Sequence, residues 1–194
     1  MSAAKTNLSK SKLISAWQCP KRLYLEKFRP ELATVTDSME AMFALGHEVG
    51  DVAKVLYGTA ESVEIPFDRR TGRTVEATRE LLASGARFPI FEATFEHDGI
   101  LVRCDVLIPV DEGWRLVEVK ASTSVKDYHV LDCAIQEWVL RHAGVSLTSI
   151  RLAHVNNQFM YQGDGNYDGL LLEHDLTDEV KSVDPRVEDL VATA

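Results

Sequence analysis

The feature that most constrains this chain is a run of alternating apolar and polar residues at positions 103–121, reading RCDVLIPVDEGWRLVEVKA. Two strand-like runs flank the polar, glycine-containing break DEGW, and this pattern predicts a β-hairpin. Side chains alternate between the two faces of a strand, so Glu118 and Lys120 share a face. Asp105 joins them across the hairpin, within about 5–8 Å of Glu118. The hairpin therefore gathers two carboxylates and an ammonium on one face.

The turn and the apolar pattern together predict the register of this hairpin. We expect Val110 to pair with Arg115, which sets Asp105 opposite Lys120. A slip by one residue would turn the charged side chains into the core. The opposite face is then almost entirely apolar, and its expected members are Val102, Cys104, Val106, Ile108, Val110, Val117, Val119 and Ala121.

A second hairpin precedes the first. The dipeptide Asp98-Gly99 lies between two strand-like runs and is a strong two-residue turn signal. Pairing of His97 with Ile100 would set Glu92 opposite Asp105. A third carboxylate is thus expected beside the other charged groups of the sheet.

These residue types suit a magnesium or manganese site. Both ions favour hard oxygen ligands, and water and substrate phosphate complete their coordination. Asp105 and Glu118 offer carboxylates, and the carbonyl of Val119 could add a third ligand. Lys120 would stay charged beside the carboxylates, where it could orient a water or stabilise negative charge. The competing interpretation is a solvated sheet face on which acidic and basic groups simply alternate.

The remaining pattern predicts an α/β domain with a mixed sheet. Expected helices cover 8–28 (broken at Pro20), 38–57, 72–84 and 126–142, with a last one capped by Asp175 or Thr177. Further strands are expected at 62–67, 150–156 and 169–173. In the helix 38–57 the core candidates are Met42, Phe43, Val49, Ala53 and Leu56. One face of the helix 126–142 should carry Tyr128, Asp132, Ile135 or Gln136, and Val139.

Length and composition indicate one domain of 194 residues. We expect a basic helical arm at 1–30, a core at 38–160 and an acidic extension at 173–194. No apolar run approaches the ~20 residues of a membrane span, and the N-terminus lacks a signal-peptide pattern, so we expect a cytoplasmic protein without a membrane partner. The cysteines are widely spaced, which excludes a thiolate zinc finger built from this chain alone.

Charge bears on nucleic-acid binding in two ways. The formal net charge of −9 counts against a large nonspecific nucleic-acid surface, because phosphate binding needs Lys and Arg. The first thirty residues are nevertheless basic, and such an arm could hold DNA locally. Lys21 and Arg22 are the candidates for phosphate contacts, and the alternative is that they are only solvated.

Taken together, these residues resemble the PD-(D/E)xK nuclease superfamily, in which an Asp on one strand precedes an E-x-K on the next. More narrowly, the chain is similar to the RecB-type and CRISPR-associated RecB-like exonuclease branch. The stretches that carry the resemblance are LSKSKL…WQCPKRLY from Leu8, LGHEVG from Leu45, LVEVKA from Leu116, and Tyr128 with DCAIQ from Asp132.

The resemblance implies a restriction-endonuclease-like core, in which a mixed sheet is flanked by helices and an N-terminal helical segment is added. It implies a metal-dependent DNA nuclease, expected to be an exonuclease that acts with Mg²⁺ or Mn²⁺ on DNA that is single-stranded or has free ends. By resemblance, His47, Asp105 and Glu118 are metal ligands. Lys120 is the catalytic lysine and Gln136 lies against the site. The resemblance also places Glu92 near the metal and Tyr128 near the substrate.

The cysteines of the chain depart from that pattern. Many relatives bind an iron–sulfur cluster through one N-terminal and three C-terminal cysteines; Cys19 matches the first, but no cysteine follows Cys133, so we expect no cluster here. An alternative function is a catalytically weak or inactive nuclease-fold module that binds DNA or a protein. Other nuclease or defence subunits are conceivable partners. A zincin site is excluded because Asp51 stands where His47-Glu48 would need a second His.

Overall fold

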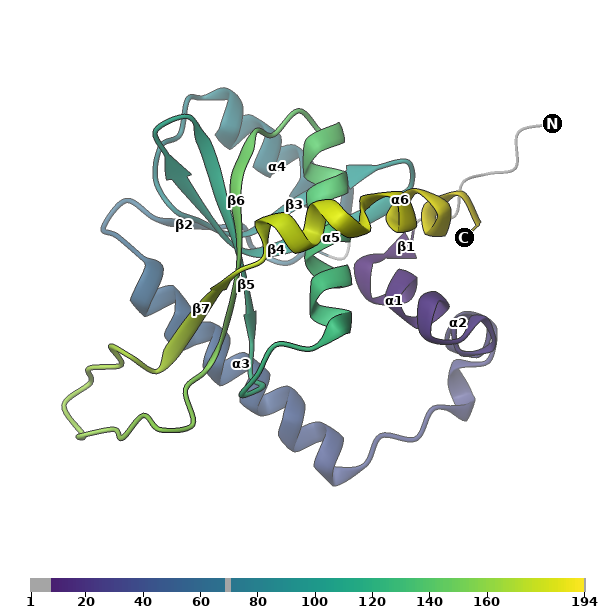
Figure 1. Ribbon diagram of the computed structural model, residues 1–194, viewed down its shortest axis with the longest axis horizontal. Helices are drawn as coiled ribbons and strands as arrows, with labels where there is room; N and C mark the ends of the chain where they lie inside the picture. Colours follow the sequence, from purple (N-terminus) through teal and green to yellow (C-terminus); the bar gives the residue numbers. More distant parts are fainter. Residues whose placement is uncertain (1–7, 69–70, 194) are drawn as a thin grey trace.

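The computed structural model describes residues 8–68 and 71–193. Within these ranges seven strands form one sheet in the order β2-β3-β4-β5-β6-β7, and β1 adds to β4 (Figure 1). The strands are β1 Leu8–Ser9, β2 Val63–Glu64, β3 Ile90–His97, β4 Ile100–Val110, β5 Gly113–Lys120, β6 Leu147–Val155 and β7 Leu171–Asp175. The helices are α1 Lys10–Gln18, α2 Pro20–Phe28, α3 Asp37–Tyr57, α4 Thr71–Ala83, α5 Asp127–His142 and α6 Thr177–Thr193, with a short 3₁₀ turn at Pro30–Leu32.

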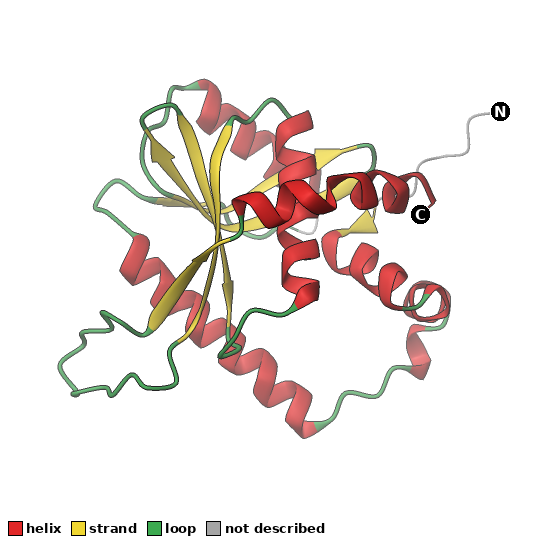
Figure 2. Ribbon diagram, viewed as in Figure 1, coloured by secondary structure: helices red, strands yellow, loops and turns green. Residues whose placement is uncertain are grey.

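The sheet is mixed, as the sequence predicts. Strands β3, β4 and β5 form an antiparallel meander, β5 and β6 are parallel, and β7 returns antiparallel to β6. Helix α5 makes the crossover between the parallel strands β5 and β6, which a tight turn could not connect. Helices flank the sheet, and α1 and α2 form the N-terminal helical segment (Figure 2).

The β3–β4 hairpin has the predicted register, and the β4–β5 hairpin does not. His97 pairs with Ile100, as the Asp-Gly turn indicates. In the β4–β5 hairpin, however, Val110 pairs with Gly113 and not with Arg115. The ladder continues to the edge of the two-residue turn Asp111-Glu112, so the pairing is tighter by two residues than expected. A shift of two residues does not by itself change the face on which a side chain lies.

Sequence punctuation sets the helix boundaries. Pro20 is the first residue of α2, where its missing N–H costs nothing, and it separates α2 from α1. Thr36 caps α3, since its hydroxyl accepts the amide of Met39 at 3.4 Å. The carboxylate of Asp175 accepts the amide of Thr177 at 3.0 Å, which supports the start of α6. The break at Pro20 and the cap at Asp175 were predicted from the sequence, whereas the cap at Thr36 was not.

The core lies on both faces of the sheet, contrary to the single apolar face that we expected. Helices α5, α6 and α1 cover one face, and α3 crosses the other (Figure 1). The larger cluster, on the α5 side, includes Cys104, Leu107, Leu116 and Ile135. The smaller cluster, on the α3 side, consists of Phe91, Val106, Val117 and Ala153, with partly buried Tyr57, Ile108, Val119 and Leu171 against it.

Strand β4 changes faces at Asp105. Cys104 packs into the larger cluster, whereas Val106 packs into the smaller one, although alternation would put them on the same face. The neighbouring strand is irregular at the same level, because Glu92 has a left-handed φ of 60° and is missing from the β3–β4 ladder. Such a conformation strains a residue that is not glycine. The irregularity leaves Asp105 beside an opening between the strands.

Helix α3 is half buried and half exposed. Val49 and Ala53 are buried as expected, but the core assignments of Met42 and Phe43 are wrong, since these side chains are 71% and 59% exposed. In the first half of α3, Met42 and Phe43 line a cavity together with strand residues such as Asp105 and Val119, and so they stay largely exposed. In the described part of the chain, no helix is long and apolar enough to cross a membrane.

Candidate active site

A ring of alternating charges stands between strand β5 and helix α5. The Lys120 ammonium lies 2.6 Å from Glu118 Oε1 and 2.6 Å from Asp132 Oδ2. The Lys10 ammonium closes the ring, 2.9 Å from Glu118 Oε1 and 2.8 Å from Asp132 Oδ1. Both carboxylates are buried. Because buried charges are costly unless they are paired, this closed arrangement is what makes their burial possible.

Local structure explains how these four side chains meet. Glu118 and Lys120 are two residues apart on β5 and so share the face that α5 covers. Asp132 and Gln136 are one helical turn apart on α5 and point at that face together. Lys10 is the first residue of α1, directly after β1, which pairs with β4 at Leu8–Ser9. The short β1 ladder thus delivers Lys10 to the site from the far end of the chain.

The ring keeps Glu118, Lys120 and Lys10 charged. Burial tends to raise the pKa of Glu118, but the ammoniums of Lys10 and Lys120 outweigh it and hold that pKa well below its usual range. Burial tends to lower the pKa of Lys120, but the carboxylates of Glu118 and Asp132 hold it above the usual range. Lys10 is shifted upward in the same way, with Asp132 as the main carboxylate. Lys120 is therefore held as an ammonium in this arrangement.

Gln136 orients the buried glutamate from the other side. Its Nε2 donates to Glu118 Oε2 at 2.7 Å, and it lies 3.5 Å from Asp132 Oδ1. The side chain is fully buried, and among the described residues its Oε1 has no hydrogen-bond partner. A buried amide oxygen without a partner is unusual. Gln136 thus lies against the site and brings an unused hydrogen-bond acceptor to it.

Asp105 lies at the opening between β4 and β5. Its Oδ2 accepts the backbone N–H of Val119 at 2.7 Å, in place of a ladder bond. A strand residue directs its N–H and C=O to the same side, so the Val119 carbonyl also faces Asp105. Burial, followed by the charge of Glu118, raises the pKa of Asp105 to about 7. Without a bound cation, the positive charge of Lys10 and Lys120 does not offset the effects of burial and of Glu118 on the Asp105 carboxylate.

A cavity of about 400 Å³ between α3 and the sheet adjoins Asp105. His47, Glu92 and Val119 line it together with Asp105, so it gathers the predicted metal ligands other than Glu118. The carboxylate of Glu92 also pairs with Arg103, whose Nε lies 2.7 Å from Glu92 Oε2. Burial raises the pKa of Glu92 despite that pair. This cavity and the charged ring meet where β4 and β5 separate.

The donor set suits a hard divalent cation held by few protein ligands. Among the described residues, the hydrogen bond found at Asp105 is on its Oδ2, and Glu118 Oε2 accepts only from Gln136, so each carboxylate keeps lone pairs for a cation. Within residues 8–68 and 71–193, no group of at least three His, Cys, Asp or Glu side chains is arranged to hold a metal by itself. Mg²⁺ commonly uses one or two carboxylates and completes its shell with water and phosphate, so the residues fit such an ion.

The predicted DNA contacts lie beside the ring. Tyr128 and Arg22 line a hollow of about 310 Å³ whose wall includes Asp132. Arg22 is held there by Glu26, with 2.8 Å between its Nε and the carboxylate. Lys21 is exposed on the next side of α2, in the wall of a neighbouring hollow. The structure thus brings Arg22 and Tyr128 together and leaves Lys21 on the surface.

Sequence reasoning missed two members of the ring. Asp132 was placed on the correct face of its helix but given no role, although its spacing from Gln136 was a usable signal. Lys10 is separated from Glu118 by 108 positions, and no local pattern distinguishes it from other lysines of the basic arm. Only the β1–β4 pairing reveals its place.

Comparison with known proteins bears on the fold. No protein family model matches the chain, and no curated protein matches it. Among solved structures, LHK-Exo in complex with dAMP is similar with a TM-score of 0.50 and 11% identity, over 96% of this chain and 85% of that one. A second structure of this alkaline exonuclease, from Laribacter hongkongensis, matches with a TM-score of 0.37, 12% identity and coverage of 96% and 88%. The protein SSO0001 matches with a TM-score of 0.48, 15% identity and coverage of 100% and 79%. The likeness to LHK-Exo shows that the chain has a nuclease-type fold.

Proposed function

We propose that this chain is a Mg²⁺- or Mn²⁺-dependent deoxyribonuclease that removes nucleotides from DNA ends. The observation that carries the proposal is the meeting of Asp105, Glu118 and Lys120 where β4 and β5 separate, with Gln136 packed behind. The fold shared with the exonuclease LHK-Exo, which was solved with dAMP, supports it. We further propose that the chain acts as one nuclease domain of the RecB-like branch.

Each residue has a definite task in this proposal. Asp105, Glu118 and the Val119 carbonyl would hold the ion, with His47 and Glu92 at the cavity side. A bound Mg²⁺ or Mn²⁺ supplies charge neutralisation on the phosphate and a more acidic water. Lys120 donates hydrogen bonds as an ammonium, and can orient the attacking water and stabilise charge that develops on the phosphate. Gln136 and Lys10 keep the Glu118 carboxylate in place.

The experiment uses linear DNA labelled at one end and closed circular DNA, each with Mg²⁺, Mn²⁺ or EDTA. We expect release of labelled nucleotides from the linear substrate with either metal, no cutting of the circle, and no activity in EDTA. Asp105→Ala and Glu118→Ala should remove the activity. Cleavage that persists in both variants would show that the site lies elsewhere, and cutting of circles would replace an end-directed reaction by an internal one.

A second candidate function is a nuclease-fold module that binds DNA or a protein partner without cutting. It is favoured by one observation: Glu118 Oε1 already accepts from both Lys10 and Lys120. Calorimetric titration with Mn²⁺ separates the two candidates when it is combined with the cleavage assay. Metal binding without cleavage would support the module, whereas metal binding with cleavage supports the nuclease.

A further inference from the structure

Helix α2 leaves an amphipathic face uncovered. None of its residues is buried, and its main contacts with other helices and strands are with α1 and the 3₁₀ turn that follows it. Tyr24 and Phe28 are 57% and 60% exposed, and their ring centroids are 5.1 Å apart. Lys21 and Leu25 fall on the same side at helical spacing. An exposed pair of aromatic rings on a helix is not explained by the folding of this chain.

The same face is basic, although the whole chain is acidic. Lys27 places its ammonium 5.7 Å from the centre of the Phe28 ring, and Lys21 is exposed one helical turn before Tyr24, whereas Arg29 just after the helix is paired with Glu31. The net charge of the chain is −9. Local positive charge around exposed rings is complementary to a polyanion that also offers flat apolar surfaces. Single-stranded nucleic acid has both properties, since its phosphates pair with cations and its unpaired bases stack on aromatic side chains.

The helix is held firmly enough to serve as a platform. Glu26, on the opposite side of α2, accepts from Lys12 and Arg22 at 2.8 Å each and from Ser15 at 3.1 Å. These bonds hold α2 against α1 and leave the aromatic face outward. The platform is therefore an ordered surface, for which little flexibility must be lost on binding.

A continuous surface leads from this face to the candidate active site. The hollow that contains Lys21, Leu25 and Arg29 shares Arg22 and Glu26 with the hollow that contains Tyr128 and Asp132. Asp132 is in turn 2.6 Å from the ammonium of Lys120. Tyr24 and Phe28 line neither hollow, so a strand that lies on α2 would enter this path at Lys21 and Leu25, at the edge of the aromatic pair.

We propose that the exposed face of α2 is a binding platform for single-stranded DNA, in which bases stack on Tyr24 and Phe28 and phosphates contact Lys21 and Lys27. The inference rests on the proposed nuclease function, because the strand held there is the one that reaches Lys120. The platform supplies affinity without sequence preference, since every base has a face that can stack.

The test measures binding apart from cleavage. A fluorescently labelled oligothymidine strand is titrated with the full chain in EDTA, and its anisotropy is followed at several salt concentrations. The variants are Tyr24→Ala with Phe28→Ala, and Lys21→Ala with Lys27→Ala. Loss of a stacking ring should raise the Kd about tenfold and leave the salt dependence unchanged. Loss of each phosphate contact should reduce the slope of log K against log salt by about 0.7.

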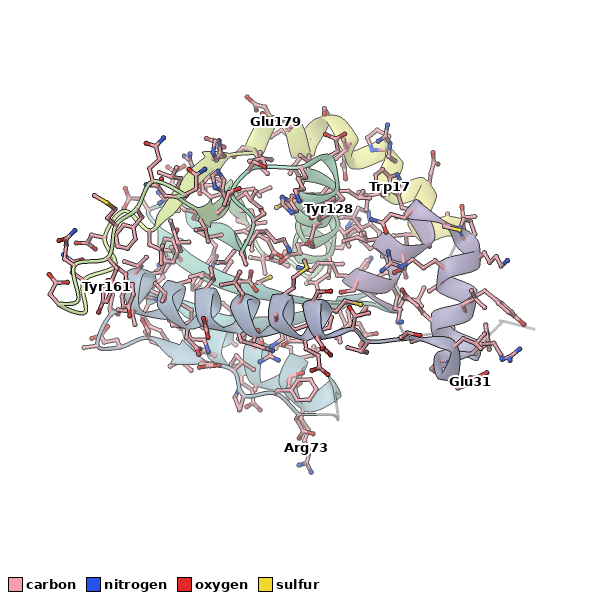
Figure 3. The ribbon with its side chains drawn as sticks, turned by 90° about the horizontal axis from the view of Figure 1, so that it is seen from below. Trp17, Glu31, Arg73, Tyr128, Tyr161 and Glu179 are labelled. Carbon is pink, nitrogen blue, oxygen red and sulfur yellow. The ribbon has the colours of Figure 1, made fainter. Side chains whose placement is uncertain are left out.

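Controls make the result specific. Tyr161→Ala removes an exposed tyrosine at the opposite end of the molecule from Trp17 and Glu31, and should leave the Kd unchanged (Figure 3). In the double aromatic variant, affinity for a duplex probe should fall much less than affinity for the single strand, because the bases of a duplex are already stacked on one another. Alanine favours helices, so circular dichroism should show that α2 persists in the variants.

Each outcome decides the inference. If the double aromatic variant has an unchanged Kd, the inference is overturned and the face is assigned to a protein partner. The same holds if the wild-type chain fails to bind the strand. Lys120→Ala distinguishes this inference from the proposed function, because it should stop cleavage and keep the wild-type Kd. If the aromatic variant loses affinity but the wild type never cleaves DNA, the platform stands and the nuclease proposal fails.

Discussion

Neutralising Asp105 should stabilise the metal-free protein, and the gain should depend on pH. In Asp105→Asn the amide oxygen can still accept the N–H of Val119, which now bonds Asp105 at 2.7 Å. The variant therefore removes the charge and keeps the hydrogen bond. It also removes a metal ligand, so that stability and metal binding should change in opposite directions.

The magnitude follows from the pKa of Asp105. Burial raises this pKa to about 7 in the folded chain, whereas an unfolded Asp has a value of about 3.9. The folded state holds the proton more tightly, so the associated stability is fully present below about pH 4 and is lost as the pH rises through 7. About three pK units correspond to about 4 kcal/mol, as an upper limit because the side chain is only partly buried.

The assay is urea unfolding of both proteins in EDTA between about pH 4 and 8. We expect the two free energies of unfolding to be similar near pH 4 and the variant to exceed the wild type by up to about 4 kcal/mol near pH 8. Added Mn²⁺ should raise the stability of the wild type alone. Asp111→Asn, in the exposed β4–β5 turn, is the matched control and should show no such trend. A difference between variant and wild type that is the same at every pH would refute the reasoning.

Two further predictions concern buried charge. Lys10→Met should lower the free energy of unfolding by about 3 kcal/mol, because Glu118 and Asp132 would keep only Lys120 as a cationic partner. Chemical denaturation measures this, and a loss no larger than that of the exposed Lys181→Met would contradict it. Burial, followed by the charge of Lys120, lowers the pKa of His129 to about 4. The stability of the wild type relative to His129→Asn should therefore fall by up to about 3 kcal/mol as the pH drops from 6.5 toward 4, on top of the Asp105 effect that both proteins share, and paired acid titrations measure this difference.

The local parts of the fold could be predicted from the sequence because they depend on neighbouring residues. Pro20 separates α1 from α2, and Asp98-Gly99 sets the β3–β4 register, in each case through the backbone preferences of one or two residues. The turn at Asp111-Glu112 was misjudged because several turn lengths suit a sequence of this type. The error of two residues does not affect the alternation along β5, and so Glu118 and Lys120 still lie together.

The parts that depend on distant contacts could not be predicted. The burial of Met42 was expected from helical spacing, but whether a helix face is covered depends on where the sheet ends. The reversal of faces at Asp105 needs the left-handed φ of Glu92 on the neighbouring strand, and no glycine announces it. Lys10 reaches the site only through β1, a two-residue strand that no sequence pattern reveals.

The central claim is that the ring of charges around Lys120 belongs to a metal-dependent nuclease site. Its most direct test is the rate at which wild type, Lys120→Met and Lys181→Met degrade end-labelled DNA with Mn²⁺. We expect the wild type and Lys181→Met to degrade the substrate at equal rates and Lys120→Met to be at least about a hundredfold slower. EDTA should stop degradation by all three proteins. Equal rates for Lys120→Met and the wild type, or degradation that continues in EDTA, would contradict the claim.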